Sequence, residues 1–161
     1  MPPASDGINI KDYDPETSLA GKRGRVSNKV DGVQRRFYKS SHGKVTAWSR
    51  TGKPDTWIPH ICEWLEQPHF PSDMIYNCEL VDQKLYFSNV DSFILRSESS
   101  AKASQEYPDN KGDLAAICFD MVKPDGDMAT GKERTDRLQQ TFLGSALHEP
   151  VSMVEIFGYI Y

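Results

Sequence analysis

The sequence lacks any long run of apolar residues, and 26% of its 161 residues are charged. Its first residues, Met1 to Asp6, contain neither a basic region nor an apolar stretch. A membrane span needs about 20 consecutive apolar residues, and a secretory signal needs an apolar core. We therefore expect a soluble intracellular (cytoplasmic) protein with no membrane partner.

Cysteine is scarce as well, and Cys62, Cys78 and Cys118 are odd in number, far apart and free of any CxxC pair. A disulfide framework or a zinc knuckle needs more cysteines or closer spacing. Adding the nearby His60 and His69 gives no common zinc pattern. The sequence predicts reduced thiols in the core.

The length fits one domain, and the prediction is an extended lead-in over residues 1–17 followed by a domain over residues 18–161. Helical spacing predicts a helix after Asp55, which could cap it, and another over 132–148. These elements predict an α+β fold, a mainly antiparallel sheet flanked by helices. Strand character occurs at 25–38, 44–49, 74–81, 84–87, 114–122 and 151–161.

Charge is unevenly distributed, although the formal net charge is only −4. Residues 21–53, called the basic segment below, hold ten Lys or Arg and a single acid. A dense block of like charge repels itself unless a counter-charge binds, so the segment predicts a face that binds phosphates. The alternative is a basic hairpin whose charges merely lie in solvent.

The sharpest local pattern is Lys29-Val30-Asp31-Gly32, within the strand expected at 25–38. On a strand, Lys29 and Asp31 would share a face about 7 Å apart, and Gly32 would let a ligand approach the backbone. A lysine nucleophile needs a neutral amine, which nearby cations favour; the candidates are Arg35, Arg36 and Arg50. By itself the pattern is more typical of a strand-edge lysine in a basic hairpin.

Two further residues carry possible chemistry. Glu79 lies in an apolar strand, where a carboxylate needs a ligand hydroxyl, a metal or a cation, and a salt bridge to an arginine is the alternative. Phe119 stands beside Asp120 in another apolar strand, where its ring could stack on a base or simply pack in the core.

Together these patterns resemble a known family. In order and separation, KVDG at 29–32, SRTGK at 49–53, CELV at 78–81 and ICFD at 117–120 resemble motifs I, Ia, III and IIIa of the covalent nucleotidyltransferases. The sequence is most similar to the adenylation domain of ATP-dependent DNA ligases. The resemblance implies part of an ATP-grasp-like adenylation domain.

The same resemblance implies a three-step reaction that uses ATP together with Mg²⁺ or Mn²⁺. Lys29 would accept AMP, the AMP would pass to a 5′-phosphate at a nick in double-stranded DNA, and the 3′-hydroxyl would displace it. The implied nucleotide-binding residues are Asp31, Gly32, Arg50, Glu79 and Phe119, with Asp31 and Glu79 near the metal. The implied DNA-binding residues are Arg35, Arg36, Arg50 and Lys53. RNA ligases, capping guanylyltransferases and a non-catalytic nucleic-acid binder remain alternatives.

The sequence also departs from this family. Gln34 stands where many ligases have arginine, and Asn77 and Cys78 replace a common Asp-Gly pair, with Asn77 still able to hydrogen-bond. Motif IV (EGxxxK) and motif V (KxK) have no match, because the chain has no Glu-Gly pair and no lysine after Lys132. The oligonucleotide-binding (OB) domain that follows them is missing too. We expect the front half of an adenylation domain, whose missing parts a second chain could supply.

Overall fold

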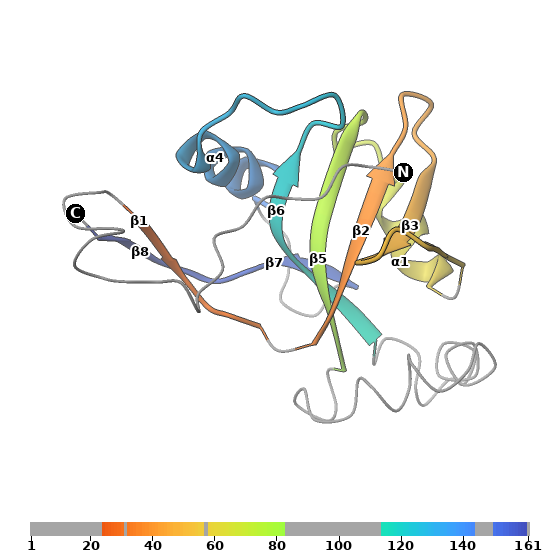
Figure 1. The fold of residues 1–161 in the computed structure, drawn as a ribbon, viewed down its shortest axis with the longest axis horizontal. Coiled ribbons are helices and arrows are strands. Elements are labelled where there is room, and N and C mark those ends of the chain that lie inside the picture. The colour runs from red at the N-terminus through yellow and green to blue at the C-terminus, as the bar shows by residue number, and fades with distance from the viewer. Residues whose placement is uncertain (1–23, 31, 57, 83–113, 144–149, 161) are drawn as a thin grey trace.

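The computed structural model describes residues 24–30, 32–56, 58–82, 114–143 and 150–160. These residues form two sheets and two helices, an α+β fold as predicted (Figure 1). The expected lead-in at 1–17 and the expected strand at 84–87 lie outside the described residues. Among the helices described, none is long and apolar enough to cross a membrane.

The main sheet has six strands in the order β4-β3-β2-β5-β6-β7. All its neighbours are antiparallel except β6 and β7, which run parallel and are joined through helix α4, because a parallel pair needs a long crossover. The strands span β2 (Val33–Lys39), β3 (Val45–Ser49), β4 (Pro54–Asp55), β5 (Met74–Asp82), β6 (Leu114–Val122) and β7 (Val151–Met153).

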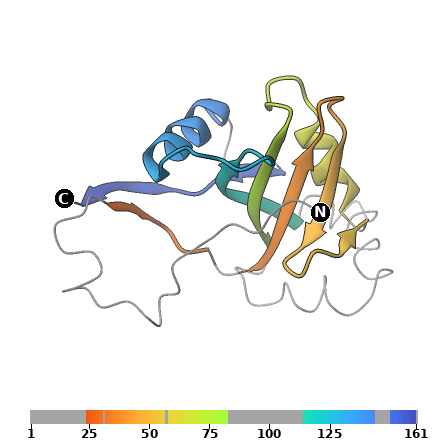
Figure 2. The ribbon, with the colours of Figure 1, turned by 45° about the horizontal axis from the view of Figure 1, so that its top comes forward.

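The second sheet is a two-stranded ribbon of β1 (Gly24–Ser27) and β8 (Ile156–Ile160), which extends away from the main sheet (Figures 1 and 2). The single strand expected at 151–161 is therefore wrong. It breaks at Val154, which is buried and donates its N–H to the carbonyl of Cys118, after which the chain leaves β6 to pair with β1.

Alternation along the strands buries one face of the main sheet, called the core face below. Phe37, Tyr76 and Met121 lie opposite one another on β2, β5 and β6 and are fully buried. Ile61 and Leu65 of α1 and Leu138 of α4 join them in one cluster. The three cysteines are free, and Cys78 and Cys118 are buried as predicted.

Helix α1 spans Pro59–Leu65, with proline in its first turn, where the missing N–H has no helical partner anyway. The expected cap by Asp55 is wrong. Ile58 is the N-cap and makes no side-chain capping bond, while Asp55 belongs to β4 and pairs with Arg35 at 2.6 Å. The buried guanidinium competes successfully for this carboxylate because each charge needs a partner.

Helix α4 spans Gly131–Thr141 and begins with a capping box. The Thr130 hydroxyl accepts from the Glu133 N–H, and the Glu133 carboxylate accepts from the Thr130 N–H at 2.6 Å. The latter bond is the main cause that holds the pKa of Glu133 below its ordinary value. The sequence predicted this helix through Leu138 and Phe142, which are buried, but not its cap.

An arginine of α4 donates a hydrogen bond to β6 beyond the residues of β6 that pair with β7. Arg137 donates to the Met121 carbonyl at 2.9 Å and pairs with Asp127. The hydrogen bond from Arg137 holds the pKa of Asp127 well below its ordinary value. Side chains thus supply donors that an adjacent strand would otherwise give to β6.

Lys39, counted in the basic segment, is buried with only 2% of its surface exposed. Its ammonium donates to the carbonyls of Leu65, Gln67 and Phe70, each at 2.9 Å, and so closes the C-terminal end of α1. Burial lowers the pKa of Lys39. This lysine supports the fold and is not available to a ligand.

Replacing Lys39 with methionine should therefore destabilise the protein. The side chain keeps a similar length, but three carbonyls lose their donor, a change expected to lower the free energy of unfolding by about 1–3 kcal/mol. Urea unfolding followed by circular dichroism measures it. Lys44→Met is the matched control, because Lys44 is exposed and pairs only with Glu66, so its midpoint should hardly move. Equal midpoints for both variants would contradict the role of Lys39.

Candidate functional site

Lys29 lies between the two sheets, in the segment that leaves β1 at Ser27 and enters β2 at Val33. The expectation that it sits inside one strand is wrong, because β1 and β2 pair in different sheets and the chain must change direction between them. The strand argument for a shared face of Lys29 and Asp31 therefore fails. Lys29 is exposed, and Asp31 lies outside the described residues.

Gly32 brings this segment against β5. A Cβ atom at Gly32 would overlap the carbonyl oxygen of Leu80 and would lie 3.1 Å from Cγ of Glu79. The glycine is thus needed for a close approach between two parts of the chain, a use that the sequence argument assigned to a ligand. As a consequence, the KVDG segment and Glu79 lie next to each other.

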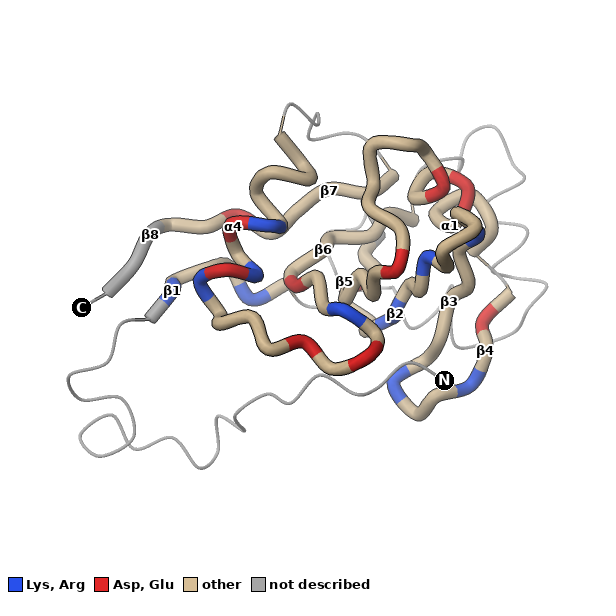
Figure 3. Tube along the Cα trace, turned by 90° about the horizontal axis from the view of Figure 1, so that it is seen from above, with Lys and Arg blue, Asp and Glu red and all other residues tan. Residues whose placement is uncertain are grey.

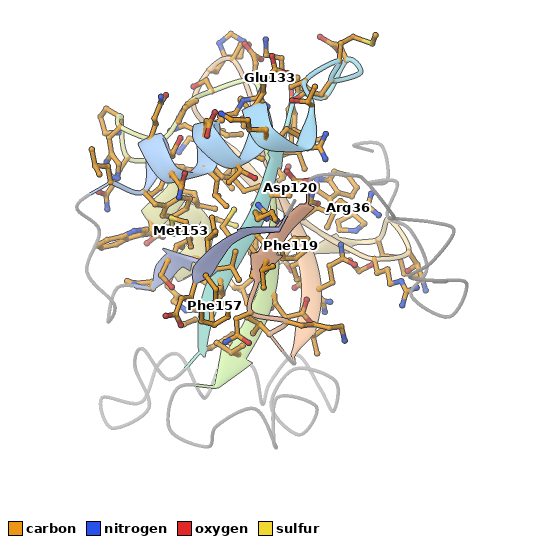
Figure 4. The ribbon with its side chains drawn as sticks, turned by 90° about the vertical axis from the view of Figure 1, so that its left-hand side faces the viewer. Arg36, Phe119, Asp120, Glu133, Met153 and Phe157 are labelled. Atoms are coloured by element: carbon orange, nitrogen blue, oxygen red, sulfur yellow. The ribbon has the colours of Figure 1, made fainter. Side chains whose placement is uncertain are left out.

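The face of the main sheet opposite the core face carries polar residues and is called the site face below. Arg36 on β2, Asn77 on β5 and Asp120 on β6 form one row across it by their pairing register. Gln34, Glu79 and Ile117 form the next row toward Gly32. Figure 4 shows Arg36 and Asp120 on neighbouring parts of this sheet.

A bulge in the β5–β6 pairing adds Phe119 to the site face. Cys78 pairs with Cys118 and Asn77 pairs with Asp120, so Phe119 is the extra residue. Simple alternation would turn Phe119 and Asp120 to opposite faces, whereas this register lets both lie on the same side (Figure 4). Phe119 is half-buried and packs in part against the hydrophobic core cluster.

Asn77 is fully buried, and neither its amide nitrogen nor its amide oxygen has a hydrogen-bond partner among the described residues. Asn77, which the sequence analysis leaves able to hydrogen-bond, makes no such side-chain bond with the described residues. An unpaired buried amide is unfavourable by roughly 1–3 kcal/mol. A buried polar group without a hydrogen-bond partner is rare in folded proteins, and one explanation for it is a functional role.

Arg36 and Arg50 are connected. Arg36 is 4% exposed and donates from Nη2 to the carbonyl of Arg50 at 3.2 Å. Arg50 begins the turn after β3, where Ser49 Oγ accepts from the Lys53 N–H at 3.0 Å. Arg50 and Lys53 are both exposed. Arg36 thus fixes the backbone of a turn that presents two cations to solvent.

Arg35 lies on the opposite face of β2 from Arg36 and is 7% exposed. Besides its ion pair with Asp55, it donates to the carbonyl of Gln34 at 2.9 Å. Its charge is therefore neutralised inside the protein. Arg35 therefore links β2 to β4 across the intervening strand β3.

Among its described residues, the basic segment does not expose all of its cations, because Arg35, Arg36 and Lys39 are buried. Figure 3 shows Lys and Arg spread over several elements and interleaved with acids. Charge counted along the sequence overestimated the charge available to a ligand. The described cations of the segment that are exposed are Lys29, Lys44, Arg50 and Lys53.

No group of three or more His, Cys, Asp or Glu among the described residues could hold a metal ion. Of the two predicted metal residues, Glu79 is half-buried on β5 and Asp31 is outside the described part. The described side chains therefore do not fit a metal bound by the protein alone. A magnesium ion that arrives on a nucleotide triphosphate needs only one or two carboxylates.

Comparison with known structures finds ligases with a similar fold. Pmar-Lig_PreS3 is 17% identical with a TM-score of 0.60, covering 86% of this chain and 31% of its own. An archaeal ATP-dependent RNA ligase is 17% identical with a TM-score of 0.51 and coverages of 86% and 32%. The ATP-dependent DNA ligase of bacteriophage T7, in complex with ATP, is 11% identical with a TM-score of 0.59 and coverages of 84% and 48%.

This chain has the fold of ATP-dependent ligases. It spans about a third to a half of the length of those solved structures. No protein-family model matches the sequence, and no curated protein is significantly similar to it. The expected likeness to a ligase adenylation domain is confirmed at the level of the fold.

The contact at Gly32 yields a direct test of the site. Gly32→Ala should displace the segment that carries Lys29 from β5, because the added methyl group overlaps backbone at Leu80 that cannot move aside without distorting the strand. We expect a clearly lower urea midpoint. Gly131→Ala is the matched control, since nothing lies within 4 Å of a Cβ there and alanine favours a helix. A Gly32→Ala protein as stable as the wild type would show that the segment is not held against β5.

Proposed function

We propose that this chain carries out the nucleotidyl-transfer chemistry of a polynucleotide ligase, with Lys29 as the nucleophile. The observation that carries the proposal is the approach of Gly32 to Glu79. It brings together two of the four motifs that the sequence shares with nucleotidyltransferases, although about 47 residues separate them in the chain. The fold supports the proposal independently, because it is shared with a DNA ligase that binds ATP.

In the proposed first step, the neutral amine of Lys29 attacks the α-phosphorus of ATP. A nitrogen–phosphorus bond forms, the bond to the bridging oxygen breaks, and pyrophosphate leaves with that electron pair. The amine proton passes to solvent or to a nearby base. Such transfers depend mainly on positioning and charge stabilisation, and less on covalent help from the protein.

The remaining residues of the site take binding roles in this proposal. The carboxylate of Glu79 accepts from a ribose hydroxyl, and the ring of Phe119 stacks on adenine. Asp31 supports the sugar and the metal that accompanies the triphosphate. Gly32 allows the close packing on which all of this depends.

We propose nicked double-stranded DNA as the polynucleotide, with the exposed Arg50 and Lys53 contacting its phosphates. Arg36 acts indirectly by holding the carbonyl of Arg50, and Arg35 remains paired with Asp55. The solved structures of this fold include both DNA and RNA ligases. The experiments should therefore compare nicked DNA with nicked RNA as substrates, and ATP with GTP as the nucleotide.

Covalent labelling tests the first step. Incubation with α-labelled ATP and Mg²⁺, followed by denaturing electrophoresis, should give a labelled protein band that Lys29→Ala abolishes. Lys123→Ala is the matched control, because Lys123 is also exposed but lies after β6, far along the chain from the motif. Label from GTP instead of ATP would indicate a capping enzyme. Salt-dependent DNA binding without any label in a folded protein would leave only a nucleic-acid binder.

Complete nick sealing should not occur with this chain alone. Motifs IV and V and an OB domain have no match in its sequence, and losing one preorganised contact in such a site typically lowers the rate by ~10²-fold or more. A nicked, end-labelled duplex incubated with the protein, ATP and Mg²⁺ should stay unsealed. Sealing that appears when a separately expressed chain with those motifs is added would identify a second subunit, whereas sealing by the 161-residue chain would refute this prediction.

A further inference from the structure

We infer that Arg25 is a positioning residue that holds the lysine-bearing ribbon against the base-stacking side of the site. The inference rests on the proposed function of Lys29 and Phe119. It concerns a residue that the sequence analysis counted only as part of the basic segment. Its support comes from hydrogen bonds that join β1 to β6 and to α4.

Arg25 leaves β1 and bridges two other elements. Its Nη1 donates to Thr135 Oγ1 on α4 at 2.8 Å, and its Nη2 donates to the carbonyl of Phe119 on β6 at 3.4 Å. Thr135 is 1% exposed, and its hydroxyl donates in turn to the carbonyl of Gly131 at 2.8 Å. Because its proton is donated to Gly131, the Thr135 hydroxyl can only accept the hydrogen bond from Arg25.

This bridge is one of the links between the ribbon and the rest of the described structure. Among the described residues, β1 pairs with β8, Ile156 of β8 packs against the core, and β8 is connected to the main sheet through the two residues that follow β7. Lys29 follows Arg25 by four residues in the chain. Between them, the Asn28 N–H donates to the carbonyl of Glu155, the residue before β8, at 3.0 Å. Rotation of the ribbon about its connections would move Lys29 relative to Phe119.

The planar guanidinium suits this role. Its two terminal nitrogens diverge at a fixed angle, so two acceptors on different elements are held at once, whereas a lysine ammonium is a single flexible point charge. The hydrogen bond from Arg25 fixes the backbone of Phe119, and the ring of Phe119 would contact the base in the proposed function. Arg25 and Gly32 then constrain the lysine segment from its two ends, toward β6 and toward β5.

The experiment compares Arg25→Met, Arg25→Lys and Thr135→Val with the wild type in single-turnover self-adenylation at varied ATP concentration. A misplacement of about 1 Å can cost ~10²-fold in rate. We expect Arg25→Met to lower the maximal rate by roughly tenfold or more while the half-saturating ATP concentration changes less. Arg25→Lys should recover only part of the rate, and Thr135→Val should give a smaller loss.

Arg137→Met is the matched control. Arg137 also reaches a β6 carbonyl from the α4 side, at Met121, but it does not contact the ribbon. It should lower the unfolding midpoint yet leave the adenylation rate of the folded protein unchanged. A normal rate in Arg25→Met, or an equal loss of rate in Arg137→Met, would overturn the positioning role.

Amide hydrogen exchange gives a readout that does not depend on activity. In Arg25→Met the amides of β1 and β8 should exchange faster than in the wild type, while those of β2 and β5 should keep their protection. If the wild type forms no adenylate but Arg25→Met still speeds amide exchange in β1 and β8 alone, the proposed function fails and the bridge stands. If the wild type forms adenylate and the ribbon exchanges equally in both proteins, the bridge is refuted and the proposed function stands.

Discussion

The pairing of β5 with both β2 and β6 is the constraint on which the candidate site depends. It fixes which residues of β5 face the core and which face the site, because side chains alternate with a period of two. Tyr76 and Cys78 fill the core, while Asn77 and Glu79 face the other way. A slip of one residue would exchange the two sets and would also remove the backbone that Gly32 packs against.

Because some cations of the basic segment are buried, its positive charge counted along the sequence exceeds the charge that its described residues expose on the surface. Arg35, Arg36 and Lys39 are all nearly inaccessible, and each is held by a carboxylate or by carbonyl oxygens. Their desolvation is offset only while these partners stay in place, so they couple β2 to its neighbours. The exposed Arg50 and Lys53 lie on the turn whose carbonyl at Arg50 accepts from Arg36.

The main strands and α4 could be predicted because short apolar runs and helical spacing are local signals. The motif resemblance selects Lys29, Glu79 and Phe119 as candidates from equally local signals, and their roles stay predictions. The ribbon could not be predicted, since β1 pairs with β8 more than a hundred residues later in the sequence. The bulge at Phe119, the pairing of Asp55 with Arg35 and the use of Gly32 also depend on registers that no local pattern encodes.

The relation between the two sheets, more than any single side chain, determines whether this site can work. In the proposed reaction an amine attacks phosphorus in line with the leaving oxygen, so Lys29 at the junction of the sheets would have to be held relative to a nucleotide bound on one of them. The short connections before β2 and after β7 limit that relation without fixing it. Ion pairs and hydrogen bonds across the junction must therefore supply the remaining precision. The fold is shared by ligases of DNA and of RNA, so in the proposed function the choice of polynucleotide would come from surfaces outside this junction, such as the exposed turn at Arg50.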